Sequence, residues 1–358
     1  MIQQLIISLP MFVCGILSAE LAVSLWLRYD PPKTCLQGWA LTATALYATH
    51  YIFFSGAPAH VMRVADAVYT MTNLAVYPLY LVYIYELTDP RPLRLRRRAV
   101  FFLYFTSAIF GVIAWYFYGT PTQELVHNIC RVLFALSVVM TVVLGIRRIR
   151  SYHHLLDTLY ADTEERQLKG IGVILYILLV MSLLSIVVNF LGRYYFIGSK
   201  WLAIPSVLFS CLIFAIGQVG LRQKYSIHDV EADEAKEEPE LQPVAVENVQ
   251  AETEEKSVET STLILKLRTL VEDERLFTQP NLKLDDLARR LGTNRTYLLR
   301  AMKQDLQLTF SEYINKQRIA YALQLMKAHP DWTKEDIAEQ VGYASLSSFY
   351  RNLRELGE

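Results

Sequence analysis

Two arginines near the end of the chain share the same offset from an apolar residue. Arg300 and Arg351 each stand two positions after an apolar residue, Leu298 and Phe349 respectively. At 3.6 residues per turn, this offset turns a side chain roughly 200° around a helix, away from the core. The planar fork of arginine can pair with O6 and N7 of guanine together, worth ~1–3 kcal/mol of discrimination. The spacing therefore predicts outward base contacts, the alternative being ordinary solvated charges.

Two short helices would position Arg300, in the segment from Lys283 to Leu306. The first helix has its apolar residues at the spacing of one helical face. They are Leu284, Leu287, Ala288 and Leu291. Gly292 ends this helix, and Thr293 and Asn294 are residue types that start a new one by accepting bonds from backbone N–H groups. Such a short break makes the two helices cross steeply, the geometry that offers a second helix to a major groove.

A second segment, from Thr333 to Leu356, repeats this plan. Gly342 breaks the helix and Ser345 can cap the next one. The packed positions are Ile337, Ala338 and Val341 in the first helix, and Phe349 and Leu353 in the second. The two segments therefore form a tandem pair of helix-turn-helix units. Their equivalent residues, such as Ala288 and Ala338, are fifty positions apart.

A longer helix should connect the two units. Thr309 opens it through a Thr-Phe-Ser-Glu capping box, and it should end near His329 and Pro330. About twenty residues at ~1.5 Å each give a strut of roughly 30 Å, close to the ~34 Å turn of a duplex. Two recognition helices could therefore enter successive major grooves.

Three blocks of this region resemble the DNA-binding domain of AraC/XylS-type transcription regulators. They are LDDLARRLGTNRTYLLRAMK, TFSEYINKQRIAYALQLM and IAEQVGYASLSSFYRNLRE, in the family's order and spacing. The resemblance covers about a hundred residues and does not extend to residues 1–220. It implies a transcription regulator that binds double-stranded DNA, and a location in the inner membrane of a bacterium if the chain is membrane-anchored.

In that family the first halves of both recognition helices read bases. With Leu298 and Phe349 taken as equivalent, the resemblance implies as DNA-binding residues Thr296, Leu299 and Arg300 in the first helix and Ser347, Tyr350 and Arg351 in the second. Arg295 and Lys303 are expected to hold phosphates. Residues 261–358 contain 15 Lys and Arg against 13 Asp and Glu, so non-specific binding to phosphates should be modest and salt-sensitive.

The chain departs from the family at two places. Gln307 stands where the family usually has a glycine after the first recognition helix, so we expect that turn to be built differently. The sequence ends at Glu358, where the family normally continues into a last short helix. We therefore expect the second helix-turn-helix unit to be less stable than the first.

Residues 1–224 contain seven apolar stretches of the length that crosses a bilayer, about 20 residues each. They are Leu5–Leu27, Leu36–Phe54, Ala67–Leu87, Ala99–Tyr118, Ile129–Ile146, Gly170–Leu191 and Trp201–Leu221. Buried helices of a soluble domain are the alternative, but they would need charged faces that these stretches almost lack. The predicted fold is all-α: a polytopic seven-helix membrane bundle followed by a soluble domain with two helix-turn-helix units.

Basic residues concentrate in alternate loops, as expected for the cytoplasmic side of a membrane protein. The loop around residues 91–98 holds five arginines, and the loop from Arg147 to Lys169 holds another cluster. This pattern predicts that the N-terminus lies outside and that the C-terminal domain is cytoplasmic. Residues 226–260 hold twelve acidic and two basic residues, so we expect 225–260 to be a disordered linker before the DNA-binding domain at 261–358.

Ionisable side chains inside a bilayer are costly and are candidates for function. Glu20 falls in the first stretch and His50 in the second, so both are candidate sensing residues. The alternative is that such groups make packing bonds or anchor the helices at the interface.

The sequence favours a membrane-anchored transcription regulator. Its expected partners are DNA, the lipid bilayer, a small-molecule or protein signal, and a second copy of the chain in a homodimer. A protein-interaction or tethering module without DNA binding is the alternative. An enzyme is not expected, because the sequence lacks HExxH, GxSxG and phosphate-binding glycine loops. The four cysteines form no CxxC pair, so neither a metal nor a cofactor is expected.

Overall fold

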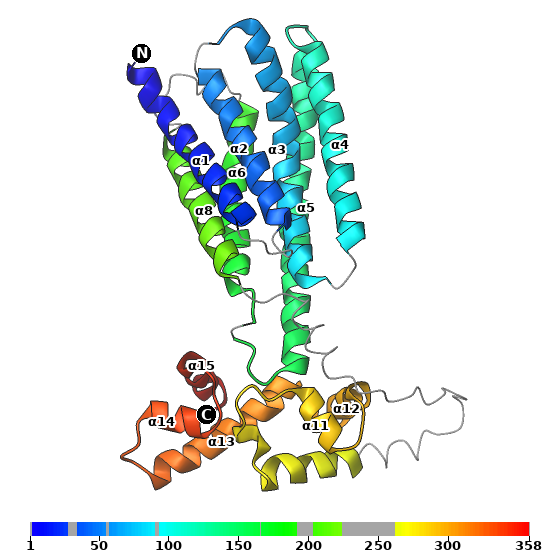
Figure 1. Ribbon diagram of the computed structural model, residues 1–358, viewed down its shortest axis with the longest axis vertical. Helices are drawn as coiled ribbons and strands as arrows, with labels where there is room; N and C mark the ends of the chain where they lie inside the picture. The colour runs from blue at the N-terminus through cyan, green and yellow to red at the C-terminus, as the bar shows by residue number, and fades with distance from the viewer. Residues whose placement is uncertain are drawn as a thin grey trace, which may run out of the picture. The chain divides into compact units, whose positions relative to one another are not determined.

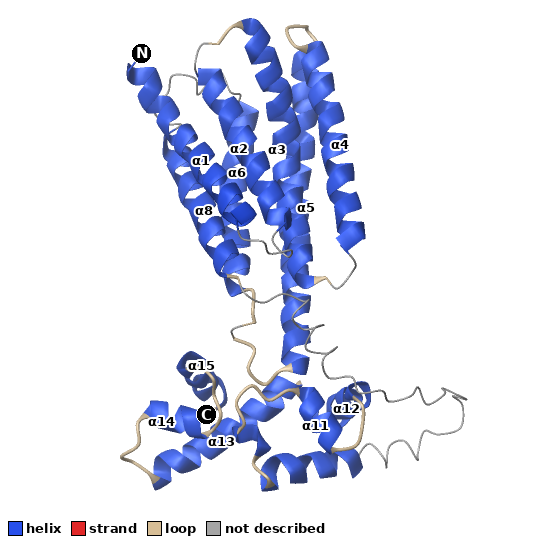
Figure 2. Ribbon diagram, viewed as in Figure 1, coloured by secondary structure: helices blue, strands red, loops and turns tan. Residues whose placement is uncertain are grey.

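The computed structural model describes residues 2–27, 34–54, 57–89, 93–164, 166–191, 203–223 and 262–357. Within these ranges every regular element is helical, and the one isolated bridge joins Tyr160 to Lys283 (Figure 2). The predicted all-α class is therefore confirmed. The predicted acidic linker, 225–260, lies outside the described residues.

Contacts divide the chain into two compact units, drawn in Figure 1. The first unit is Met1–Arg150 with Leu168–Glu237, and the second is Ser151–Gln167 with Glu238–Glu358. Residues 151–167, which precede the sixth apolar stretch, thus belong with the C-terminal residues. The boundary falls inside one continuous helix, because α5 runs through residue 150.

Each predicted apolar stretch coincides with a helix of the first unit. These helices are α1 (Ile2–Leu27), α2 (Thr34–Phe54), α3 (Ala59–Thr88), α4 (Leu93–Phe117), α5 (Gln123–Leu159), α6 (Lys169–Leu191) and α8 (Ala203–Arg222). α1 packs on α2 and α8, α2 on α3, α3 on α4, and α6 on α8. Among the residues that the structure describes, three helices are long and apolar enough to cross a membrane: α3, residues 98–117 of α4, and α5. Shorter apolar helices cover Phe12–Leu27, Lys169–Leu184 and Val207–Arg222.

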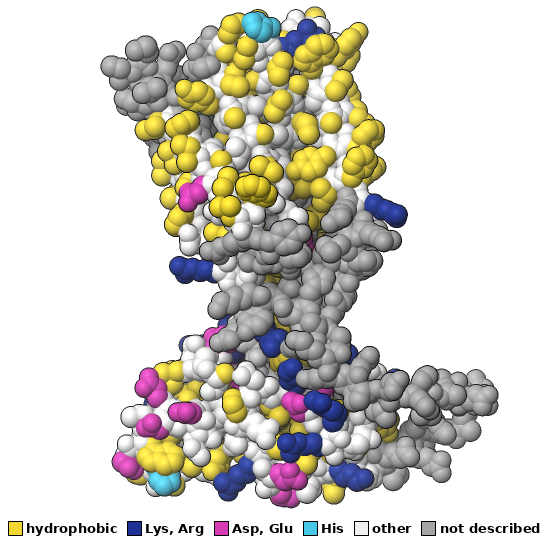
Figure 3. Space-filling model, in the orientation of Figure 1, with side chains coloured by type: hydrophobic (Ala, Val, Ile, Leu, Met, Phe, Trp, Pro, Cys, Tyr) yellow, Lys and Arg dark blue, Asp and Glu magenta, His cyan; other side chains and the backbone are white. Residues whose placement is uncertain are grey.

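The first unit turns apolar side chains outward. On α4, Phe101 is 72% exposed and Phe102 67% exposed, and Val112 and Tyr116 follow the same pattern. Figure 3 shows hydrophobic side chains spread over the visible surface of this unit. A water-soluble bundle would instead place these residues in its core.

Two buried carboxylates, in contrast, connect helices of this unit. Glu86 on α3 accepts bonds from the start of α2, at 2.9 Å from the Cys35 backbone nitrogen and 3.2 Å from the Thr34 hydroxyl. Asp66, also on α3, lies 2.9 Å from Nε2 of His127 on α5. Both carboxylates are nearly inaccessible, so they connect helices rather than meet solvent.

The second unit contains the two helix-turn-helix segments. Residues 262–268 are helical and lead into η3 (Thr269–Asp273) and η4 (Leu276–Thr278). The first helix pair is α11 (Leu284–Arg290) and α12 (Arg295–Ala301), followed by η5 (Met302–Leu306). The connecting helix is α13 (Phe310–Ala328), and the second pair is α14 (Lys334–Gln340) and α15 (Leu346–Leu356).

The predicted helix starts are confirmed. The Asn294 side chain accepts a bond from the backbone of Tyr297 at 2.7 Å and caps α12. Thr309 and Glu312 form the predicted capping box of α13. Ser345 caps α15 by accepting from the backbone of Ser348. Gly292 and Gly342, the predicted breaks, both take positive φ.

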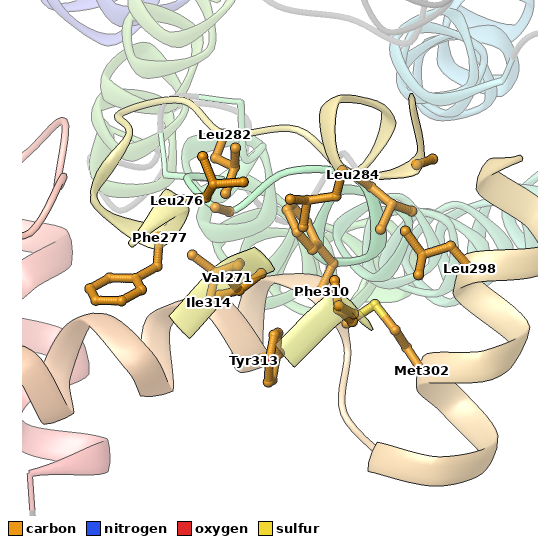
Figure 4. Close-up of a cluster of buried hydrophobic side chains, with 14 of the residues drawn as sticks. Val271, Leu276, Phe277, Leu282, Leu284, Leu298, Met302, Phe310, Tyr313 and Ile314 are labelled. Atoms are coloured by element: carbon orange, nitrogen blue, oxygen red, sulfur yellow. The ribbon is translucent and has the colours of Figure 1, made fainter. Parts of the chain in front are cut away.

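Two hydrophobic clusters hold this unit together. The larger one joins residues 263–284 to α11, α12 and the start of α13, and Figure 4 shows Leu284, Leu298, Phe310 and Ile314 among its members. The smaller one joins the rest of α13 to α14 and α15, around Phe349. Because α13 contributes to both clusters, it links the two helix-turn-helix segments.

Gln307 occupies the turn where the family usually has glycine. Its φ of 54° lies in the left-handed region, and it ends η5 there. The turn thus has the backbone conformation that a glycine would favour, with a glutamine held in it. This conformation costs a residue with a Cβ roughly 1–2 kcal/mol.

We expect Gln307→Gly to stabilise the second unit by about 0.5–1 kcal/mol, because relief of this strain exceeds the entropy that glycine adds to the unfolded chain. Amide hydrogen exchange of α12 and η5 in the full chain measures the change. Gln304→Gly is the matched control: it places glycine inside the exposed helical turn and should destabilise by ~1 kcal/mol. Equal effects of the two substitutions would contradict the argument.

Candidate nucleic-acid interface

The first recognition helix, α12, has one buried and one exposed side. Leu298 is fully buried, whereas Thr296 and Arg300 are exposed, which is the placement that the spacing predicted for Arg300. Leu299 is half-buried and packs against the larger hydrophobic cluster, so only part of its side chain faces outward. Their contacts with bases stay a prediction.

The two expected phosphate contacts lie at opposite ends of this helix. Arg295, at the first turn, has its guanidinium 3.9 Å from the carboxylate of Asp285 on α11. Lys303 is exposed in η5, just after α12. The carboxylate of Asp285 partly neutralises Arg295, while Lys303 presents its charge to solvent.

The second recognition helix, α15, also has one buried and one exposed side, but more of its outer side chains contact other residues. Phe349 is fully buried, and Ser347 and Tyr350 are exposed. The ammonium of Lys334 lies 5.4 Å from the centre of the Tyr350 ring. Arg351 is half-buried, with its guanidinium 3.9 Å from the carboxylate of Glu164.

Arg318 is the residue of this region that sequence reasoning missed. It lies on α13, is fully buried, and donates three bonds: to the backbone oxygens of Phe277 at 2.6 Å and Gln279 at 2.7 Å, and to the carboxylate of Asp162 at 2.9 Å. Its guanidinium also lies 5.2 Å from the centre of the Tyr343 ring. Arg318 thus joins residues 277–279, Tyr343 of the second helix-turn-helix segment and Asp162 of the segment before α6.

Tyr343 has the chemistry that this contact needs. Burial raises the pKa of Tyr343 to about 12, so the neutral phenol is favoured further at this position. A neutral aromatic ring offers its electron-rich face to a guanidinium. No spacing signal marks either residue, because position 318 fits the polar pattern of an exposed helix position.

Residues 160–162 are built into the second unit. The backbone nitrogen of Ala161 donates to the oxygen of Leu282 at 3.0 Å. Its oxygen accepts from the side chains of Ser311 and Asn315, each at 3.1 Å. Asp162 pairs with Arg318 through one oxygen and accepts from the backbone of Asn281 through the other. These contacts explain why residues 151–167 group with the C-terminal unit.

The two candidate sensing residues of the first unit have different surroundings. Glu20 is exposed on α1. His50 is half-buried on α2, where its Nδ1 lies 2.9 Å from the Leu46 oxygen and its ring packs edge-on against Tyr69. Their sensing role stays a prediction. The described residues contain no group of three or more His, Cys, Asp or Glu side chains that could hold a metal ion.

The geometry can be set beside known proteins. Residues 287–356 match the family model described as "Helix-turn-helix domain", which spans α11 to α15. Two proteins of Bacillus subtilis (strain 168) are similar to this part of the chain. The "Uncharacterized HTH-type transcriptional regulator YtdP" is 35% identical over 78 residues, 22% of this chain and 10% of that protein. The "Uncharacterized transcriptional regulatory protein YesN" is 32% identical over 91 residues, 25% of this chain and 24% of that protein.

These matches confirm the resemblance of the C-terminal domain to AraC/XylS-type helix-turn-helix regulators and assign no family to the preceding apolar helices. The chain spans at most a quarter of the length of these two relatives. No solved structure matches the chain.

Proposed function

We propose that this protein is a membrane-anchored transcription regulator whose C-terminal unit binds specific DNA sequences. One observation carries the proposal: two helix-turn-helix segments, joined by α13, coincide with the matched residues 287–356. Each segment presents an exposed arginine or serine on the outer side of its recognition helix, the side that a major groove would meet. The proposal assigns no catalytic step to the chain.

The apolar exterior of the first unit supports membrane anchoring. Side chains such as Phe101 and Phe102 are mostly exposed, and only 17% of the most apolar window of α4 is buried. In contact with lipid tails such a surface is favourable, whereas in water it would promote aggregation. The arginine-rich loops support a cytoplasmic location of the C-terminal unit, since such loops favour the cytoplasmic side of a membrane.

The first unit would detect the signal. Ionisable groups inside a bilayer are costly and are therefore candidates for the groups on which a stimulus acts. We therefore propose that this unit responds to a small-molecule or protein signal, with Glu20 and His50 as candidate sensing residues. The signal would change how strongly two copies of the chain form a homodimer. Dimer formation would raise the local concentration of the DNA-binding units and so transmit the response to DNA.

The test of DNA binding uses the full chain in lipid nanodiscs. Duplexes are enriched from a random-sequence pool, and the affinity of the enriched duplex is compared with that of a scrambled one at several salt concentrations. The proposal expects selective, salt-dependent binding. A chain that recovers no preferred sequence would instead be a tethering or protein-interaction module.

We expect Arg300→Ala to weaken binding to the enriched duplex by about 1–3 kcal/mol and to relax the preference at one base position. The physical reason is the loss of a bidentate contact with one base. Lys303→Ala is the matched control, because it removes the same charge from the next turn: it should weaken binding to all sequences alike and lower the salt dependence. If Arg300→Ala behaves as Lys303→Ala does, Arg300 contacts a phosphate.

A further inference from the structure

One carboxylate occupies the start of the second recognition helix. Oε2 of Glu164 accepts bonds from the hydroxyl of Ser345 at 2.6 Å, from that of Ser347 at 3.2 Å, and from that of Ser348. Its other oxygen lies 3.9 Å from Nη1 of Arg351. Glu164 therefore engages four side chains in the cap and first two turns of α15.

These groups are the ones that a DNA phosphate would use. The N-terminal end of a helix carries a partial positive charge, and hydroxyl and guanidinium donors at such an end bind phosphate oxygens. A carboxylate and a phosphate are both anions, so they compete for the same donors. Ser347 and Arg351 are, in addition, two of the predicted base-reading residues.

The first recognition helix differs in this respect. The positions of α12 that correspond to Ser347 and Arg351 are Thr296 and Arg300, and both are exposed. The two recognition helices are thus unequally prepared for DNA, because one has its outer side exposed and the other has an internal anion on it.

The side chains in the Glu164 contact are more exposed to solvent than those in the neighbouring Asp162 contact. The side chains of Asp162 and Arg318 are 9% and 0% exposed, whereas those of Glu164 and Arg351 are 25% and 29% exposed. A buried pair is costly to break, whereas the donors around a partly exposed carboxylate can exchange it for water or for another anion. Glu164 can therefore leave α15 while Asp162 keeps the segment attached.

We propose that Glu164 is an intramolecular competitor of DNA, which blocks the second recognition helix until it is displaced. This inference rests on the proposed DNA-binding function. α5 ends at Leu159, five residues before Glu164, so a change at the end of this helix reaches the contact through very little chain. The first recognition helix would bind first, and release of Glu164 would admit the second.

The test compares variants of the full chain in lipid nanodiscs on one duplex, enriched from a random-sequence pool by the unsubstituted protein. Glu164→Gln and Glu164→Ala should each tighten binding by about five- to thirtyfold, because the binding-competent state no longer has to be freed from a closed one. Asp331→Asn is the control: it removes one negative charge from an exposed turn of the same unit and should change affinity by less than about threefold.

Unchanged affinity of both Glu164 variants, with the duplex still bound, would overturn the inference and leave the proposed function intact. Failure of every protein to enrich a duplex would overturn the proposed function and this inference with it.

A second measurement needs no substitution. Amide hydrogen exchange of the full chain is followed with and without the enriched duplex. The inference expects slower exchange in α15 and faster exchange in residues 163–167 when DNA is bound, since the segment loses its contact. Slower exchange in both places would show that Glu164 stays on α15 in the complex, which contradicts the proposal.

Discussion

We expect Arg318→Met to destabilise the C-terminal unit by about 3–5 kcal/mol. Methionine fills much of the same volume but provides no donors. It would leave the Asp162 carboxylate buried beside two backbone oxygens, those of Phe277 and Gln279, that have lost their partner. Urea unfolding of the full chain, followed by hydrogen exchange of amides in α13, measures the loss.

Two further variants make this prediction specific. Lys316→Met changes an exposed residue of the same helix and should stay within about 0.5 kcal/mol of the parent. Arg318→Met combined with Asp162→Asn should recover part of the lost stability, because the buried charge is gone. A small effect of Arg318→Met would mean that the three bonds contribute little beyond packing.

Gly342→Ala should destabilise the same unit by about 3 kcal/mol or more. The residue has a φ of +89°, and a Cβ on it would lie 2.2 Å from the backbone oxygen of Thr278 in η4. The three nearest atoms all belong to the backbone of Thr278, so no flexible side chain can move aside, and strain and overlap add. Thermal unfolding of the full chain, resolved by hydrogen exchange in α14 and α15, measures the effect.

Gly292→Ala provides the matched comparison. Gly292 holds the equivalent break in the first helix-turn-helix segment, with a φ of +65°, but nothing lies within 4 Å of an added Cβ. Only the backbone strain remains, so we expect a loss of about 1–2 kcal/mol. Equal losses at the two glycines would mean that the close approach to Thr278 has no energetic consequence.

Local patterns made much of the second unit predictable. The helix starts at Asn294, Thr309 and Ser345 depend on side chains that accept bonds from the backbone three residues onward. Such caps can be predicted from residues that are close together in the sequence. The outward placement of Arg300 follows from its offset from Leu298, since helical geometry alone sets that angle. Helices α1 to α6 and α8 were predictable from apolar stretches of about 20 residues each.

The positions that connect distant parts of the chain were not predictable in this way. Leu299 was expected among the base-reading residues of α12, and part of its side chain packs against the larger hydrophobic cluster, which gathers residues from distant parts of the sequence. Gln307 takes the left-handed conformation without being glycine, and its neighbours Leu306 and Leu308 both pack against the larger hydrophobic cluster. Neither feature has a periodic signature.

The amino-acid sequence alone determined the all-α class, the two helix-turn-helix segments and the apolar helices, because each depends on residues within one or two turns of one another. Only the tertiary structure decided that residues 151–167 join the C-terminal unit, that Arg318 is its buried link, and that Glu164 lies on α15. These three facts depend on contacts between residues far apart in the sequence, such as Asp162 and Arg318, which are separated by 156 positions. A pair so far apart is specified by the packing of the whole unit, and the residues around either partner carry no sign of the other.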